Sequence, residues 1–167
     1  MKVRTFLISL LLHSFAYGET WFDMTTGIIW NYEIIGNEAC IYKGVEQPAI
    51  SLMSPQSVTI PTSLGGKQVT AIGDYAFYNC WAITTVKIPT SVKSIGAKAF
   101  CRCWGMTSIT IPINVNAMSD DVFEDCWGLE EIKVATGNRT FSSSNGVLYN
   151  SSKSTVIRCP QAKQGGD

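Results

Sequence analysis

The sequence predicts a repeat solenoid of the α/β type, in which parallel strands and short helical turns stack coil upon coil. Three observations support this prediction. Groups of apolar residues recur at a fixed interval of 23 residues, apolar and polar residues alternate within part of each group, and two of the alternating stretches end at a proline, Pro89 and Pro112. A fixed period of about 20 to 50 residues is the sequence signature of stacked structural repeats.

The repeat is clearest in columns of residues that occupy equivalent places in successive coils. Each coil contributes one phenylalanine, one cysteine and one tryptophan. These columns are Phe77, Phe100 and Phe123; Cys80, Cys103 and Cys126; and Trp81, Trp104 and Trp127. An earlier unit, 58–61, fits the same pattern once a five-residue insertion around Gly65 and Gly66 is allowed. We therefore place the repeats at 58–134.

Each coil begins with a strand. In the stretch TVKI (85–88) the valine and the isoleucine point inward and Lys87 points outward, as alternation in a strand requires. Pro89 ends this strand because proline has no N–H to donate to a continuing ladder. A second short extended stretch follows at 92–95 and turns at Gly96. Two of the three sides of the coil are therefore extended.

The third side is expected to be one or two helical turns over 98–103. Ala99, Phe100 and Cys103 have the spacing i, i+1 and i+4, which places them on one helix face toward the core. In the first coil, Asp74 stands where it would cap the N-terminus of the equivalent helix. The phenylalanine and cysteine columns are thus predicted to be structural core.

The two ends of the array must be closed, because each coil buries its apolar face only against a neighbour. We expect β-hairpin caps at both ends, in an N-terminal region at 19–57 and a C-terminal region at 135–167. The hairpins pair 28–34 with 39–42 across Gly36 and Asn37, and 146–149 with 154–159 across 150–153.

The first eighteen residues (1–18) are typical of an export signal. Lys2 and Arg4 provide the charged start, 6–12 the apolar segment and 16–18 a small-x-small cleavage site before Glu19. The apolar segment is shorter than the roughly 20 residues that a transmembrane helix needs, so no membrane insertion of the mature chain is expected. An uncleaved anchor is the alternative. We expect a secreted or cell-surface protein.

The mature chain would contain no histidine, because His13 is the only one and lies inside the signal. This excludes catalysis by histidine bases and metal sites with histidine ligands. Without Lys2 and Arg4, 11 basic residues face 13 acidic ones, a balance that does not favour nucleic acid as a partner. We expect no enzyme activity, no catalytic residues, no metal and no cofactor.

With these columns in place, a resemblance to a known family is visible. The segment IPTSVKSIGAKAFCRCWGMTSITIP (88–112) resembles the BspA-type leucine-rich repeat of many bacterial and some protist surface and secreted proteins. The segments VTIPTSLGGKQVTAIGDYAF (58–77) and NGVLYNSSKSTVIRCP (145–160) resemble the opening and closing elements of such repeat blocks. The resemblance covers 28–160 and implies a curved solenoid that binds proteins or mediates adhesion.

The sequence departs from that family in two ways. A small polar residue usually follows the cysteine, whereas this chain has a tryptophan, and many relatives contain far more coils. The final residues, 164–167, contain no anchor or sorting signal, so the C-terminal cap is also open to continuation in a longer parent protein.

Two surfaces are candidate binding sites. The tryptophan column, Trp81, Trp104 and Trp127, either packs structurally or forms an exposed aromatic ladder suited to sugar rings or an apolar protein patch. The other candidate is the outward face of the strands, which serves partners in repeat proteins generally. Its residues are Ser57, Thr59, Thr85, Lys87, Ser108, Thr110, Glu131 and Lys133.

The cysteines and acidic residues are expected to be structural. The cysteine column is interpreted as buried free thiols, since repeat symmetry points the side chains in parallel and a disulfide needs them to converge. Cys40, Cys101 and Cys159 lie outside this column, their disulfide state is left open, and Cys101 is expected to be exposed. The acidic group is interpreted as structural rather than as a calcium site, because two of its members stand at an expected helix N-terminus, which favours anions, and no EF-hand-type loop surrounds them. Its members are Asp120, Asp121, Glu124 and Asp125.

The leading hypothesis is a secreted or cell-surface binding module that mediates protein–protein or cell-adhesion contacts. The alternatives are a structural scaffold segment of a larger surface protein, and a glycan-binding module that uses the tryptophan column. The identity of the protein or glycan partner is not specified by the sequence.

Overall fold

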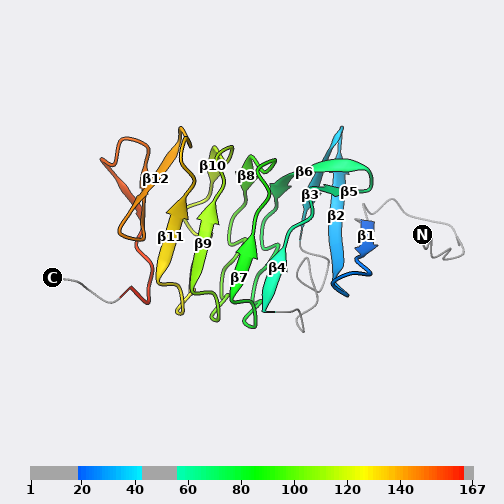
Figure 1. The fold of residues 1–167 in the computed structure, drawn as a ribbon, viewed down its shortest axis with the longest axis horizontal. Coiled ribbons are helices and arrows are strands. Elements are labelled where there is room, and N and C mark those ends of the chain that lie inside the picture. Colours follow the sequence, from blue (N-terminus) through cyan, green and yellow to red (C-terminus); the bar gives the residue numbers. More distant parts are fainter. Residues whose placement is uncertain (1–18, 43–55, 164–167) are drawn as a thin grey trace, which may run out of the picture.

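The computed structural model describes residues 19–42 and 56–163. The predicted signal peptide, with its lone histidine, and the last residues of the C-terminal cap (164–167) lie outside the described residues. The described residues fold into a solenoid whose coils lie side by side along the long axis, with the N-terminal hairpin at one end and the C-terminal strands at the other (Figure 1).

One side of the solenoid is a sheet of four parallel strands in the order β11-β9-β7-β4. These strands are β4 (Ser57–Thr59), β7 (Thr85–Lys87), β9 (Ser108–Ile111) and β11 (Glu131–Val134). Thr85 pairs with Ser108 and Ser108 with Glu131, each 23 positions apart. Neighbouring strands of this sheet are therefore paired in a register that equals the repeat period. Ser57 pairs with Thr85, 28 positions later, as the period plus the five-residue insertion predicts.

A second sheet runs behind the first and contains the parallel strands of three coils and the N-terminal hairpin. Its strands are β1 (Glu19–Phe22), β2 (Ile29–Ile35), β3 (Glu38–Ile41), β5 (Ser63–Leu64), β6 (Lys67–Ile72), β8 (Ser94–Ile95) and β10 (Ala117–Met118). β6, β8 and β10 pair in parallel, again 23 positions apart. β2 and β3 form the predicted antiparallel hairpin, and β3 continues the sheet in parallel with β6.

The insertion forms a small hairpin of its own. Ser63 and Leu64 in β5 pair antiparallel with Gln68 and Lys67 in β6. The turn between them contains Gly65 and Gly66, both with positive φ (56° and 76°), a conformation that glycine adopts at little cost. The five extra residues therefore leave the coil without shifting the register of the following strands.

The third side of each coil is a chain of tight turns, and the prediction of short helical turns is wrong. The backbone amides of Tyr75, Phe77 and Asn79 donate to carbonyls of the next coil, while those between them donate three residues back. Tyr75 and Asn79 also have positive φ (56° and 61°), which an α-helix of L-residues does not accommodate. No helix among the described residues is long and apolar enough to cross a membrane.

Asp74 does not cap a helix of its own coil. Its Oδ1 accepts a hydrogen bond of 2.7 Å from the backbone N–H of Ala97 in the next coil. In the third coil, Asp121 Oδ1 accepts from the N–H of Lys98 in the coil before it, at 3.2 Å. These carboxylates therefore join neighbouring coils, because the turns present their N–H groups along the solenoid rather than along a helix axis.

The core is a continuous stack along the solenoid axis. Phe77 and Phe100 are fully buried with ring centroids 5.0 Å apart, and Phe100 and Phe123 follow at 6.0 Å, both pairs nearly parallel. Trp30 from the N-terminal hairpin meets Phe77 edge-on at 6.2 Å and closes this stack at one end. The aromatic stack therefore runs from the cap through all three repeat coils.

The C-terminal strands close the other end. β12 (Phe141–Ser144), β13 (Val147–Asn150) and β14 (Val156–Arg158) form an antiparallel sheet that contains the predicted hairpin. The Sγ of Cys103 and of Cys126 donates to the phenylalanine carbonyl of the preceding coil. The last such carbonyl, that of Phe123, instead accepts from the guanidinium of Arg158 in β14, at 2.7 Å. Arg158 thus substitutes for the coil that would come next.

Asn138 joins the last coil to the cap. Its Nδ2 donates to the carbonyls of Pro112 and Val115, and its Oδ1 accepts from the N–H groups of Thr140 and Phe141. All four bonds are at most 3.0 Å long. The side-chain amide of Asn138 therefore stabilises the turn that precedes β12.

Candidate binding surfaces

The tryptophan column lies in the loops that precede β7, β9 and β11. These strands begin at the lower edge of the molecule in Figure 1. The exposed fractions are 55% for Trp81, 46% for Trp104 and 64% for Trp127. The rings of Trp104 and Trp127 are nearly parallel, with centroids 5.9 Å apart. The column is therefore both packed and accessible, so the structure combines features of the two sequence-based interpretations.

A glycine follows two of these tryptophans for a steric reason. The N–H of Gly105 donates to the carbonyl of Trp81 at 3.1 Å. A Cβ at Gly105 would lie 2.7 Å from that oxygen, and one at Gly128 would lie 2.2 Å from the carbonyl oxygen of Trp104. The glycines allow the loops to approach closely, and this approach brings the rings into a column.

Stacking determines which part of each ring a partner can reach. Two nearly parallel rings with centroids 5.9 Å apart overlap with an offset, the arrangement that aromatic quadrupoles favour. The facing surfaces of Trp104 and Trp127 therefore cover each other in part. The column is better described as an aromatic ridge than as a row of open faces.

The outward face of the four-stranded sheet is small and mixed in charge. Thr85, Lys87, Thr110 and Lys133 are exposed, as are Ser57 and Thr59, whereas Ser108 and Glu131 are half-buried. Lys133 and Glu131 form an ion pair of 2.9 Å on this face. The face adjoins the tryptophan column but has no dominant charge of its own.

The phenylalanine and cysteine columns are buried throughout, with every member 2% exposed or less. Burial raises the pKa of the Cys126 thiol to about 11 and that of Cys80 to about 12, because a thiolate is poorly solvated in the core. All six cysteines are unpaired, with Cys40 half-buried and Cys159 exposed.

Cys101 is buried, and the expectation that it is exposed is wrong. Only 2% of its surface is accessible. Tyr78 and Glu124 occupy the equivalent places in the coils on either side and are half-buried. The cysteine side chain is shorter than both, so it does not reach the surface between them.

The acidic group of the third coil is held by ion pairs and turns. Lys98 pairs with Glu124 at 2.9 Å, and Arg102 pairs with Asp125 at 3.4 Å. The pKa of Asp121 is lowered, first by the hydrogen bond from the Ser119 hydroxyl. Within 19–42 and 56–163, no three histidine, cysteine, aspartate or glutamate side chains come together to hold a metal ion.

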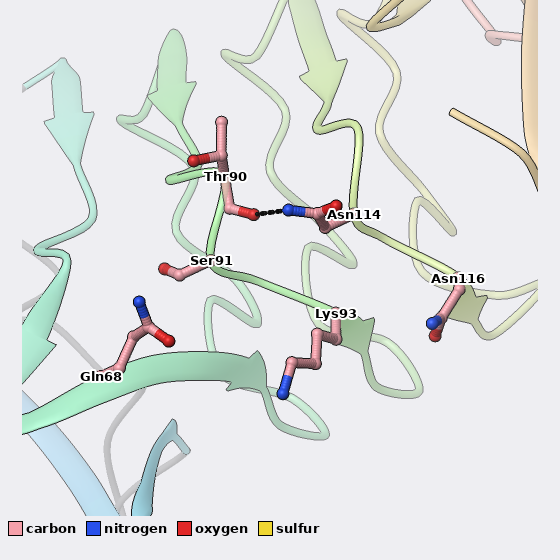
Figure 2. A pocket seen from close by; sticks show the side chains of 6 residues that line it. All are labelled: Gln68, Thr90, Ser91, Lys93, Asn114 and Asn116. Carbon is pink, nitrogen blue, oxygen red and sulfur yellow. Dashed lines mark hydrogen bonds between the residues drawn. The ribbon is translucent and has the colours of Figure 1, made fainter. Parts of the chain in front are cut away.

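The structure also contains a polar groove that the sequence analysis did not single out. It lies beside the turns that follow β7 and β9, and Figure 2 shows the side chains that line it. They are Gln68, Thr90, Ser91, Lys93, Asn114 and Asn116, which we call the amide groove. Gln68, Ser91 and Asn114 are 23 positions apart, as are Lys93 and Asn116, so polar columns at the repeat period were the available signal.

Comparison with known proteins identifies the repeats. The family model for the BspA type leucine rich repeat region (6 copies) matches residues 49–163, well over half of the chain. A search of curated proteins gives no match. A leucine-rich repeat protein from Bacteroides ovatus is 26% identical with a TM-score of 0.53, over 68% of this chain and 29% of its own. The present chain thus corresponds to under a third of that relative.

Two further solved structures are similar. A leucine-rich repeat protein from Bacteroides capillosus is 25% identical over 66% of this chain and 95% of its own, with a TM-score of 0.45. A leucine rich cell surface protein from Faecalibacterium prausnitzii is 17% identical over 85% of this chain and 62% of its own, with a TM-score of 0.30. From the family match and the 23-residue register of its sheets, the chain belongs to the BspA-type leucine-rich repeat family.

Proposed function

We propose that this protein is a secreted or cell-surface binding module whose tryptophan ridge, formed by Trp81, Trp104 and Trp127, docks against a protein partner. The single observation that supports this most is that all three tryptophans, one from each coil, are about half exposed or more, with Trp104 and Trp127 stacked on each other. Contiguous exposed apolar surface of this kind commonly marks interaction sites. Tryptophan is also among the residues that contribute most to binding energy in protein interfaces.

The ridge favours a protein over a glycan as its partner. A sugar ring packs its apolar side against an open aromatic face, and in this column the facing surfaces of Trp104 and Trp127 are partly covered by each other. Half-exposed rings stacked in this way would fit instead between side chains in an apolar cleft of a partner. The neighbouring strand face, with Thr85, Thr110 and Lys133 exposed, would supply the polar rim that interfaces usually have.

The proposal includes an extracellular location and a role in recognition. The predicted signal at 1–18 would direct the chain out of the cytoplasm. On the third side, two ion pairs join neighbouring coils, Lys98 with Glu124 and Arg102 with Asp125. The chemistry of the ridge is therefore that of recognition rather than of proton transfer.

The experiment is a binding screen of the secreted chain against immobilised extracellular-matrix and plasma proteins, by biolayer interferometry. Replacement of all three tryptophans by serine should abolish binding to any protein that the wild type captures, while the circular dichroism spectrum and the melting temperature change little. The matched control is Ile29→Ser, Ile35→Ser and Val156→Ser together. These side chains are 47%, 60% and 56% exposed, close to the tryptophans, but lie in the caps.

Equal loss of binding in both triple variants would show that general exposed apolar surface is responsible and would contradict the proposal. Unchanged binding after the tryptophan substitutions would place the interface elsewhere. A chain that captures nothing would support the alternative of a scaffold segment in a larger surface protein.

A further inference from the structure

We propose that the amide groove is a second binding site and that its ligand is a neutral oligosaccharide. The groove is a cavity of about 420 Å³ on a different side of the coil from the tryptophan ridge. It is lined by the side chains of β6 and of the turns that follow β7 and β9, as Figure 2 shows. The proposal is independent of the function proposed for the ridge.

The groove is formed by the repeat itself. Gln68, Ser91 and Asn114 occupy equivalent places in successive coils, and Lys93 and Asn116 form a second column beside them. Neighbouring parallel strands lie about 4.8 Å apart, so equivalent polar groups recur at this spacing along the solenoid axis. A ligand that itself repeats a polar unit can therefore meet the same kind of group in each coil.

Several groups in the groove have hydrogen-bonding capacity left over. The Oγ of Ser91 is buried and has no hydrogen-bond partner in the described part of the chain. Among the described residues, no partner is found for the side-chain amides of Gln68 and Asn116 either, while Asn114 Nδ2 donates to the Thr90 carbonyl at 2.8 Å. A buried hydroxyl without a partner is costly, and rotation of the Ser91 side chain toward the groove would let a ligand supply that partner.

The charge of the groove favours a neutral ligand. Its only cationic lining residue, Lys93, forms an ion pair of 2.6 Å with Glu38, so its charge is already balanced. The lining contains carboxamides and hydroxyls, and no aromatic or large aliphatic side chain. Sites for apolar small molecules are lined mainly by hydrophobic residues, so this groove is unsuited to them. Carboxamides both donate and accept, which matches the hydroxyl groups of a sugar.

The extent of the groove favours a chain of sugars over a single one. A second cavity of about 340 Å³ shares Asn114 and Asn116 with the first and is also lined by Ile113, Arg139 and Thr140, so this part adds an apolar side chain and one cation. The two cavities therefore form one path along the axis from β6 toward the C-terminal cap. A ligand on this path would cross at least three coils.

The test is isothermal titration of the secreted chain with a panel of neutral oligosaccharides of glucose, mannose, xylose and N-acetylglucosamine, each beside its monosaccharide. We expect an oligosaccharide to bind with an affinity that changes little with salt, and the monosaccharide to bind more weakly. The double variant Gln68→Ala and Asn116→Ala should weaken binding about tenfold or more, because each loses a hydrogen bond to the ligand and none to the described residues of the protein. Thr107→Ala, an exposed substitution in the loop that precedes β9, is the control and should bind as the wild type.

Ser91→Ala separates a ligand role from a structural one. It should weaken oligosaccharide binding while leaving the melting temperature of the free protein unchanged or higher, because it removes an unpartnered buried hydroxyl. A fall in melting temperature with unchanged sugar affinity would show that Ser91 is structural and would overturn the proposal.

Three other results would also overturn the proposal. One is that no oligosaccharide of the panel binds. Another is that binding is lost in the tryptophan triple variant and kept in the groove variant, which would assign the sugar to the ridge. The last is that the groove variant loses affinity for an extended peptide rather than for a sugar. None of these outcomes decides whether the ridge binds a protein, so the two proposals can fail separately.

Discussion

The substitution Phe100→Ala tests the register of the whole solenoid. Phe100 is fully buried and its ring lies between those of Phe77 at 5.0 Å and Phe123 at 6.0 Å. Removing it deletes two aromatic contacts at once and leaves a cavity in the middle of the stack, where neither neighbour can collapse without moving its own coil.

The expected loss of stability is near the upper end of what such truncations cost. Core phenylalanine-to-alanine substitutions destabilise by about 3 to 5 kcal/mol. Each aromatic pair contributes about 0.5 to 1.5 kcal/mol beyond burial, and two pairs are lost here. We therefore expect a loss of about 4 to 5 kcal/mol, a large share of the roughly 5 to 15 kcal/mol that stabilises a typical domain.

The assay is urea denaturation followed by circular dichroism, with Lys87→Ala as the control. Lys87 lies in the adjacent strand column with its side chain exposed, so its loss should change stability by less than about 0.5 kcal/mol. A loss below about 2 kcal/mol at Phe100, or comparable losses at the two positions, would refute the assignment of inward and outward residues.

Three further predictions concern groups that join neighbouring coils. Asn138→Ala should destabilise by about 2 to 4 kcal/mol in urea denaturation, because it removes four hydrogen bonds to backbone groups; a loss below 1 kcal/mol would contradict this. Gly128→Ala should lower the melting temperature and change tryptophan fluorescence, because its Cβ would lie 2.2 Å from the Trp104 carbonyl; an unchanged spectrum would argue against the close approach. Burial raises the pKa of Cys126 from 9.0 to about 11, so the folded state keeps a proton that the unfolded chain loses. This contribution is fully present below pH 9.0 and is lost as the pH rises toward 11, by up to about 1.4 kcal/mol per pH unit, and Cys126→Ala should make the measured slope shallower.

The strands and their register could be predicted because identical residues recur 23 positions apart. In a solenoid, residues that are one repeat period apart in the sequence lie side by side in neighbouring coils. The pairing of Thr85 with Ser108 therefore follows directly from the repeat. The insertion was predictable for the same reason, since Ser57 pairs with Thr85 after the period plus five residues. Both predictions needed only apolar columns, which are the strongest signal that a repeat sequence carries.

The third side could not be predicted from the same columns. The spacing of Ala99, Phe100 and Cys103 fits one helix face, and all three are indeed buried. The backbone N–H groups there donate to carbonyls of the next coil instead. These bonds join residues far apart in the sequence, so a local spacing pattern cannot predict them. The error at Cys101 has the same origin, because its burial depends on the neighbouring coils.

The candidate surfaces were predicted unevenly. Tryptophans stand out in a sequence, so the ridge could be named in advance, but the stacking of Trp104 on Trp127 required coordinates. The amide groove was overlooked because glutamine, serine and asparagine are common in turns and attract no attention singly. Their alignment becomes meaningful only when the unpartnered Ser91 hydroxyl is seen among them.

The hydrogen bonds between the turns of neighbouring coils, on the third side of the solenoid, determine how the molecule can become longer. Equivalent backbone groups form the same hydrogen bonds from one coil to the next. For example, the Phe77 N–H donates to the Ala99 carbonyl, and the Phe100 N–H donates to the Val122 carbonyl. A duplicated 23-residue segment inserted before β11 would therefore meet compatible partners on both sides, while the Arg158 cap would still close the last coil. Gene duplication can lengthen the tryptophan ridge and the amide groove together, so one genetic event would extend two recognition surfaces in register.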